Sequence, residues 1–212
     1  MDIEYVRPSE IEKRSFEIIT RELDQKGITL DERYAPIIKR CIHTTADFDY
    51  ADTLKFSKNA ADTFKSLILN GAAIVTDTNM ALSGINKKEL EKYGCSIHCY
   101  MADEEIARQA SERGVTRASV SMEKAMEVNK PVIFVIGNAP TALITIREHY
   151  DRGYQPAFVI GVPVGFVNVE AAKELIIDSE MEYIVNRGRK GGSNVAAAIC
   201  NALLYMMRDG LL

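Results

Sequence analysis

The sequence has 212 residues, enough for one α/β domain with a substantial core but short for two full domains. Its 26 basic and 30 acidic residues leave a formal net charge of −4, which argues against general electrostatic capture by nucleic acid or by an anionic membrane. With 47% hydrophobic and 26% charged residues, the composition excludes disordered, collagen-like, coiled-coil and disulfide-scaffold proteins.

The chain start lacks the basic residues and apolar run of a signal peptide. No window approaches the roughly 18 consecutive apolar residues that a membrane helix needs. We therefore expect a cytoplasmic protein with no membrane contact.

Three helical segments are predicted before the first strand. Residues 9–27 carry an apolar stripe that ends at Gly27, the expected C-cap. Residues 35–43 have a proline in their first turn. Residues 52–70 place apolar side chains at helical spacing, at Leu54, Ala61, Phe64 and Ile68.

Five short, β-rich segments follow, at residues 72–77, 96–101, 131–137, 157–162 and 182–186. Residues 132–136 are apolar on both faces, as in a central strand of a covered parallel sheet. Helical spacing separates most of these strands and returns in a last helix over 193–208. The alternation predicts an α/β fold, with a five-stranded parallel sheet between helices and extra N-terminal helices. With no linker in the chain, residues 1–212 are expected to form a single domain.

The segments that follow the first, third, fourth and fifth strands are rich in glycine, proline and small polar residues. Each alone is explained by ordinary turn chemistry. Parallel strands bring their carboxyl ends to one edge of the sheet, which is where ligands bind in open α/β folds. Four such segments together therefore favour a binding site at that edge.

The segment after the fifth strand carries Arg187, Arg189 and Lys190, then two glycines, and Ser193 at a helix start. Free backbone N–H groups, the positive end of a helix and three cations together make an anion site. The P-loop, the dinucleotide fingerprint and the Gly-x-Ser-x-Gly elbow are all absent. An anionic small molecule is the expected ligand, and a phosphate- or nucleotide-binding domain remains the alternative.

Among the three histidines, His43 is the candidate for chemistry. It closes a predicted helix and precedes a polar segment that contains Asp47 and Asp49, and both surroundings favour an imidazolium. Such a group could act as a general acid, although a C-capping histidine without a catalytic role is the alternative. We interpret His98 and His149 as structural or surface residues.

The four cysteines, at positions 41, 95, 99 and 200, are too few and too scattered for a disulfide framework. The nearest approach to a metal site is Cys95, just before the predicted strand 96–101, with His98 and Cys99 inside that strand. No second group of ligands accompanies them in the sequence, so we expect no bound metal.

The sequence resembles the precorrin-8X methylmutase family, also called cobalt-precorrin-8 methylmutases. The resemblance extends over nearly the whole chain and rests on several segments in the same order. They are RCIHTTADF at 40–48, TRAS at 116–119, GNAPTAL at 137–143, GVPVGFV at 161–167 and GRKGGS at 188–193, followed by AAA at 196–198 and NAL at 201–203.

The resemblance implies a three-layer flavodoxin-like fold and a homodimer with its active site near the interface. It also implies an isomerase of cobalamin biosynthesis that moves a methyl group between adjacent ring C carbons, from C-11 to C-12, of precorrin-8X or cobalt-precorrin-8. The products would be hydrogenobyrinic or cobyrinic acid. In the family, the histidine that matches His43 is taken as the proton donor to the ring C nitrogen.

Such a substrate is a flat macrocycle fringed with carboxylates, and it calls for cations and N–H donors around an apolar slot. The candidates to bind carboxylates are Arg14, Arg117, Arg187, Arg189 and Lys190. The candidates to add hydrogen bonds are Ser15, Thr44, Ser119, Asn138 and Ser193. Asp77 and Thr78 are expected to orient His43 or a polar edge of the substrate.

The reaction needs no redox cofactor and no nucleotide, so no cofactor is expected, and any cobalt would belong to the substrate. A non-catalytic tetrapyrrole carrier is a further alternative, because it would keep the cations but would not need His43.

Overall fold

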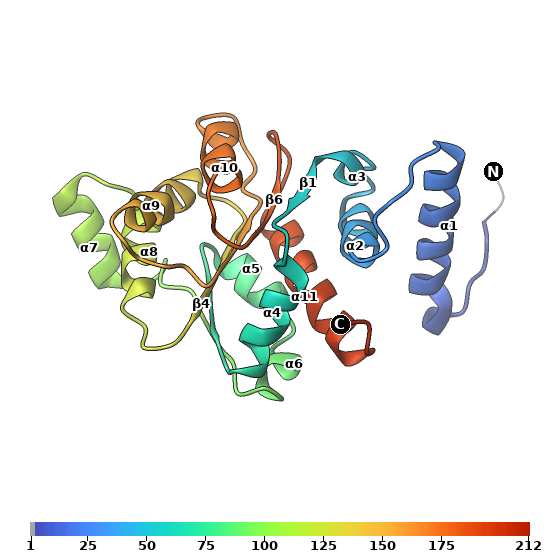
Figure 1. Cartoon of the computed structure of the whole chain (residues 1–212), viewed down its shortest axis with the longest axis horizontal. Helices are drawn as coiled ribbons and strands as arrows, with labels where there is room; N and C mark the ends of the chain where they lie inside the picture. The colour runs from blue at the N-terminus through green and yellow to red at the C-terminus, as the bar shows by residue number, and fades with distance from the viewer. Residues whose placement is uncertain (1–2) are drawn as a thin grey trace.

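The computed structural model describes residues 3–212. Its N-terminal part begins with a short 3-10 helix, η1 (Pro8–Glu10), and continues with α1 (Ile11–Gln25) and α2 (Ala35–Thr45). Figure 1 shows that α2 lies next to the body of the molecule, with α1 outside it. The two predicted helices are confirmed, but α2 continues past residue 43 and ends where Ala46 adopts a left-handed conformation with φ 54°. His43 therefore lies within the last turn and does not close the helix.

The sheet has six strands in the order β1-β6-β5-β4-β2-β3. Five of them run parallel, and their centres coincide with the five predicted strands. If these five strands are numbered 1 to 5 along the chain, their order across the sheet is 2-1-3-4-5, which is the flavodoxin-like arrangement. The bounds are β1 (Leu54–Phe56), β2 (Ala73–Thr76), β3 (Ser96–His98), β4 (Val132–Ile136), β5 (Phe158–Gly161) and β6 (Tyr183–Asn186).

The sheet has one strand more than the predicted five, and the extra strand lies within residues 52–70, where one continuous helix was predicted. The structure divides that segment into α3 (Tyr50–Thr53), β1 and α4 (Ala60–Leu69). β1 pairs antiparallel with β6, because the edge of β6 otherwise leaves its backbone groups unpaired. Leu54 is buried and Phe56 stacks on Tyr34, with ring centroids 4.0 Å apart. Pairing with β6 and burial of the Leu54 side chain thus outweigh the helical spacing of the apolar residues in this segment.

Helices cover both faces of the sheet, which gives the expected three layers (Figure 1). Side chains alternate along each strand, so Ile133 and Val135 join one core while Phe134 and Ile136 join the other. The remaining helices are α5 (Asn79–Gly84), α6 (Lys87–Glu91), α7 (Glu104–Arg113), α8 (Arg117–Met126), α9 (Pro140–Asp151), α10 (Val169–Ile177) and α11 (Ser193–Arg208). No helix in residues 3–212 is long and apolar enough to cross a membrane.

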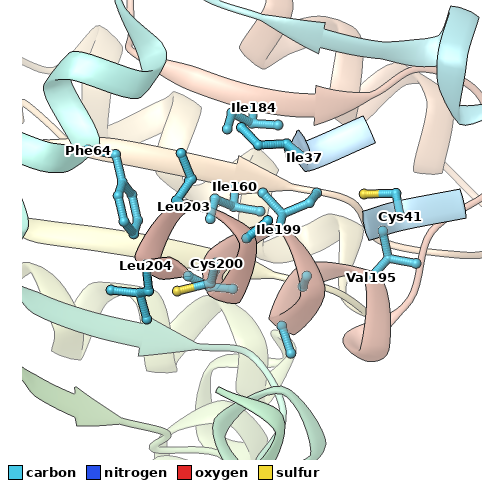
Figure 2. Packing of buried hydrophobic residues seen from close by; sticks show 14 of the residues in the cluster. Ile37, Cys41, Phe64, Ile160, Ile184, Val195, Ile199, Cys200, Leu203 and Leu204 are labelled. Carbon is cyan, nitrogen blue, oxygen red and sulfur yellow. The ribbon is translucent and has the colours of Figure 1, made fainter. Parts of the chain in front are cut away.

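The last helix, α11, is the centre of the larger core. Figure 2 shows Ile199 and Leu203 packed among Ile160 of the sheet, Ile37 of α2 and Phe64 of α4. The buried face of α11 fixes the position of its N-terminus, because the helix is rigid along its length. That N-terminus follows directly on the basic segment after β6, so core packing positions the predicted anion site.

Candidate active site

The loops that follow β2, β4, β5 and β6 meet at one edge of the sheet, which we call the carboxyl edge (residues 77–79, 137–139, 162–168 and 187–192). Thr78 Oγ1 lies 2.7 Å from Ser193 Oγ, and it also accepts a hydrogen bond from the backbone N–H of Ala81 at the start of α5. Gly137 packs so closely that a Cβ there would lie 2.6 Å from Ser193 Cα. Three of the predicted segments are therefore in direct contact.

Asp77 is fully buried where the chain order of the strands reverses, between β2 and β4. Its carboxylate accepts hydrogen bonds from the backbone N–H groups of Gly137, Asn138 and Ala139, at 2.9, 2.8 and 2.6 Å. Burial raises the pKa of Asp77 above its usual value, against these three donors, which lower it. The bonds direct Asp77 toward the loop after β4 and not toward His43, so its role is to shape that loop.

The basic segment is paired throughout with acidic side chains. Arg187 contacts Glu174 at 2.8 Å, and Arg189 contacts Glu170 at 2.6 Å. Lys190 Nζ lies 2.5 Å from Asp47 and 2.6 Å from Asp49, and these two carboxylates raise the pKa of Lys190. Asp47 and Asp49 directly follow the helix that carries His43. Lys190 therefore connects that helix to the basic segment.

The basic segment is seated against the loop after β5. The N–H of Gly192 donates to the carbonyl of Val162 at 2.9 Å, and the N–H of Gly165 donates to the carbonyl of Arg189 at 3.2 Å. A Cβ on Gly191 would lie 2.0 Å from the Val162 oxygen, so only glycine fits there. The two glycines before Ser193 thus allow close approach of two backbones.

Two buried polar residues that sequence reasoning missed also hold this segment. Lys173 of α10 donates to the carbonyls of Gly188 and Lys190, at 2.6 and 2.8 Å. Asn186, at the end of β6, donates to the same Lys190 carbonyl at 2.9 Å. A lysine within the apolar stripe of a helix is the signal that could have identified Lys173, because unpaired lysines are almost never fully buried.

His43 is exposed on α2 and stacks on Phe16 of α1, with ring centroids 5.3 Å apart and an interplanar angle of 15°. The guanidinium of Arg40 lies 4.7 Å from the centre of the same Phe16 ring and contacts Glu12 at 2.9 Å. The hydroxyl of Thr44 donates to the carbonyl of Arg40, within the helix. The imidazole therefore has a fixed ring stack and an open face.

Arg14 and Ser15 lie on α1, outside the carboxyl edge. Arg14 contacts Glu4 at 2.8 Å and Glu17 at 3.4 Å, and the Ser15 hydroxyl donates to the carbonyl of Ile11. The structure brings these two residues near His43 only through their neighbour Phe16.

Arg117 and Ser119 begin α8, where Thr116 accepts a hydrogen bond from the N–H of Ser119. Thr116 Oγ1 lies 2.8 Å from Thr141 Oγ1 and so joins the starts of α8 and α9. Arg117 is exposed at this junction, and Asn138 is exposed on the adjoining loop. Both side chains are therefore accessible to solvent beside the carboxyl edge.

The carboxyl edge also exposes large apolar side chains. Met80 is 70% exposed, Phe166 83% and Val167 76%. Phe166 additionally lies 5.7 Å from the guanidinium of Arg189, measured to the ring centre. An apolar surface beside paired cations fits a ligand that is flat, apolar in its middle and charged at its margin.

The other two histidines have partners of their own. His98 stacks on Tyr100, with centroids 5.8 Å apart, and His149 Nε2 lies 3.8 Å from a carboxylate oxygen of Glu123.

Comparison with known proteins identifies the family. A model of the family described as CbiC, precorrin-8X methylmutase, matches residues 10–206. The chain belongs to the precorrin-8X methylmutase family. It is 44% identical to the cobalt-precorrin-8 methylmutase of Salmonella typhimurium over 207 residues, which cover 96% of this chain and 97% of that relative. It is 37% identical to the precorrin-8X methylmutase of Pseudomonas aeruginosa, over 95% of this chain and 97% of the relative.

A solved structure agrees. The precorrin-8x methyl mutase of Thermus thermophilus superposes with a TM-score of 0.84 at 34% identity, covering 96% of this chain and 100% of that one. The sequence and fold relations together show that the chain is an isomerase of the methylmutase type.

Proposed function

We propose that this enzyme moves a methyl group from C-11 to C-12 in ring C of precorrin-8X or cobalt-precorrin-8, giving hydrogenobyrinic or cobyrinic acid. One observation carries the proposal: the exposed His43 is tied to the basic segment through the contacts of Lys190 with Asp47 and Asp49. These contacts hold the helix that carries the proposed proton donor against the proposed anion-binding loop. The names of the relatives supply the substrate class.

His43 is the proposed general acid. Its imidazolium gives a proton to the ring C nitrogen, which makes the conjugated system poorer in electrons and lowers the barrier to migration of the methyl group. The stack on Phe16 limits rotation of the imidazole, which reduces the loss of freedom when the proton donor meets the substrate.

The substrate carboxylates are proposed to bind Arg117, Arg189 and the first turn of α11. The backbone N–H groups of Ser193, Asn194 and Val195 have no acceptor within the described residues, and the helix dipole makes this end positive. The exposed side chains of Met80 and Phe166 are placed to contact the apolar macrocycle.

The proposal includes a homodimer, no resident cofactor and a cytoplasmic location. A second copy would cover the imidazole of His43, which is exposed on the single chain, and would exclude water from the site. A monomeric sedimentation coefficient would contradict this part. Four free cysteines, of which Cys41 and Cys200 are buried, suit a reducing compartment.

The reaction is tested by mixing the protein with cobalt-free and with cobalt-containing precursor and recording the visible absorption spectrum. Migration of the methyl group changes the conjugation of the ring, so the spectrum shifts with at least one precursor, and the responsive form identifies the pathway. A carrier would bind the tetrapyrrole without turnover, and a phosphate-binding domain would not bind it. Either result would overturn the proposal.

Arg189→Ala is expected to weaken binding of the tetrapyrrole product by about 1–3 kcal/mol, the scale of a lost charge-assisted hydrogen bond. The contact of Arg189 with Glu170 is exposed, so its loss should leave folding stability nearly unchanged. Fluorescence or absorption titration measures the affinity. Arg108→Ala is the matched control, because Arg108 forms similar exposed ion pairs on α7. Equal affinities of the two variants would place the carboxylate site elsewhere.

A further inference from the structure

Lys173 of α10 is a buried lysine packed against the basic segment, residues 187–190. Its side chain is 0% exposed, and its ammonium donates to the carbonyl oxygens of Gly188 at 2.6 Å and Lys190 at 2.8 Å. Within residues 3–212 it forms no ion pair. A buried charge without a counter-ion is costly unless dipoles solvate it, and here the two carbonyls do so.

Three successive carbonyls of the segment are held by donors. The Gly188 oxygen binds Lys173, the Arg189 oxygen binds the N–H of Gly165, and the Lys190 oxygen binds both Lys173 and Asn186. Asn186 is itself fixed, because its Oδ1 accepts a hydrogen bond from the hydroxyl of Thr53 at 2.7 Å. The orientation of each peptide group from residue 188 to residue 191 is therefore determined.

The directions of these carbonyls also determine where the backbone N–H groups of residues 189–191 point. In a planar trans peptide, the C=O of one residue and the N–H of the next point in opposite directions. With the carbonyls of Gly188 and Lys190 directed inward at Lys173, the N–H groups of Arg189 and Gly191 point away from it. Neither N–H has an acceptor within the described residues. Outward N–H donors in such a turn form an anion-binding concavity.

We propose that Lys173 is a positioning residue of the substrate-binding loop: it draws two carbonyls inward and so presents the N–H groups of Arg189 and Gly191 to a substrate carboxylate. The inference rests on the proposed function, because it assigns part of the same site. Its charge also adds a positive potential below the loop, where the nearby carboxylate of Glu170 is engaged with Arg189. Burial lowers the pKa of Lys173 to about 8, so the ammonium is still mostly protonated at neutral pH.

The test compares two ligands in Lys173→Met: hydrogenobyrinic acid and its methyl ester, which has the same macrocycle without the carboxylate charges. Lys173→Met should bind the acid at least about tenfold more weakly than the wild type, because charge-assisted bonds from the loop are lost. Binding of the ester should change by less than about twofold, since no carboxylate uses the loop. KM should rise far more than kcat falls, because Lys173 lies apart from the proton donor. Lys124→Met, on the surface of α8, is the control.

An equal loss of affinity for acid and ester, or no loss for either, would overturn the proposal and leave Lys173 a packing residue. Lys173→Gln keeps an N–H₂ donor and should lie between the wild type and Lys173→Met; it replaces the methionine variant if that variant does not fold, with the same criteria. If the wild type does not bind hydrogenobyrinic acid, the same comparison is made with cobyrinic acid and its methyl ester. Failure of the wild type to bind either acid is a distinct result, because it would overturn the proposed function itself.

Discussion

His43→Gln is expected to lower kcat by about 100- to 10,000-fold, the usual contribution of a positioned general acid. The loss arises because glutamine has no proton to give to the ring nitrogen at neutral pH. Affinity for the product should stay close to that of the wild type, because the proposed carboxylate contacts lie on other residues. The folding free energy should change by less than about 0.5 kcal/mol, since His43 is exposed and its main contact is the stack on Phe16.

Single-turnover absorption measurements separate the chemical step from binding in this variant. His149→Gln is the matched control. His149 lies in the last turn of α9 and contacts Glu123 of α8. Its turnover should equal that of the wild type. Normal turnover by His43→Gln would remove the general-acid assignment and would leave His43 a surface residue of the last turn of α2 that packs on Phe16.

Asp77→Ala is expected to destabilise the protein by about 3 kcal/mol or more. Three backbone N–H groups of the loop after β4 lose their common acceptor, and each buried donor left without a partner costs about 1–3 kcal/mol. Part of the loop remains accessible to water, which keeps the total below the sum of three full penalties. Urea denaturation monitored by circular dichroism measures the change.

Asp77→Asn keeps the size of the side chain and one acceptor oxygen, so it should lose less stability than Asp77→Ala. Its amide nitrogen would face an N–H donor, which makes complete rescue impossible. A loss below about 1 kcal/mol in Asp77→Ala would show that the loop holds its shape without the carboxylate.

Most of the sheet could be predicted from the sequence because its central strands, β2, β4 and β5, are buried along their whole length. Residues 132–136 have no polar side chain, and a short apolar run rich in β-branched residues between a proline and a glycine indicates a covered central strand. β1 could not be read in the same way. Leu54 and Ala61 are spaced as on one helix face, whereas the three-residue strand exists because β6 offers an unpaired edge. That edge is a property of the tertiary structure.

The position of the carboxyl edge was likewise predictable, but the side-chain contacts within it were not. Glycine, proline and asparagine after four strands located the loops, because parallel strands end together. The partners of the cations were not predictable. Glu170 and Glu174 meet Arg189 and Arg187 only because α10 packs beside β6. Asp77 was expected to orient His43 or a polar edge of the substrate, whereas its carboxylate binds the backbone of the loop after β4.

¹³C NMR tests most directly whether this chain moves one methyl group on a tetrapyrrole. Precorrin-8X or cobalt-precorrin-8 labelled with ¹³C in the migrating methyl group is incubated with the wild-type protein and with His43→Gln. With the wild type, the label should move from the signal of a methyl on C-11 to that of a methyl on C-12, at unchanged mass. The label should stay at C-11 in the variant. A wild-type protein that binds both labelled compounds and leaves the signal at C-11 would contradict the proposed migration of the methyl group.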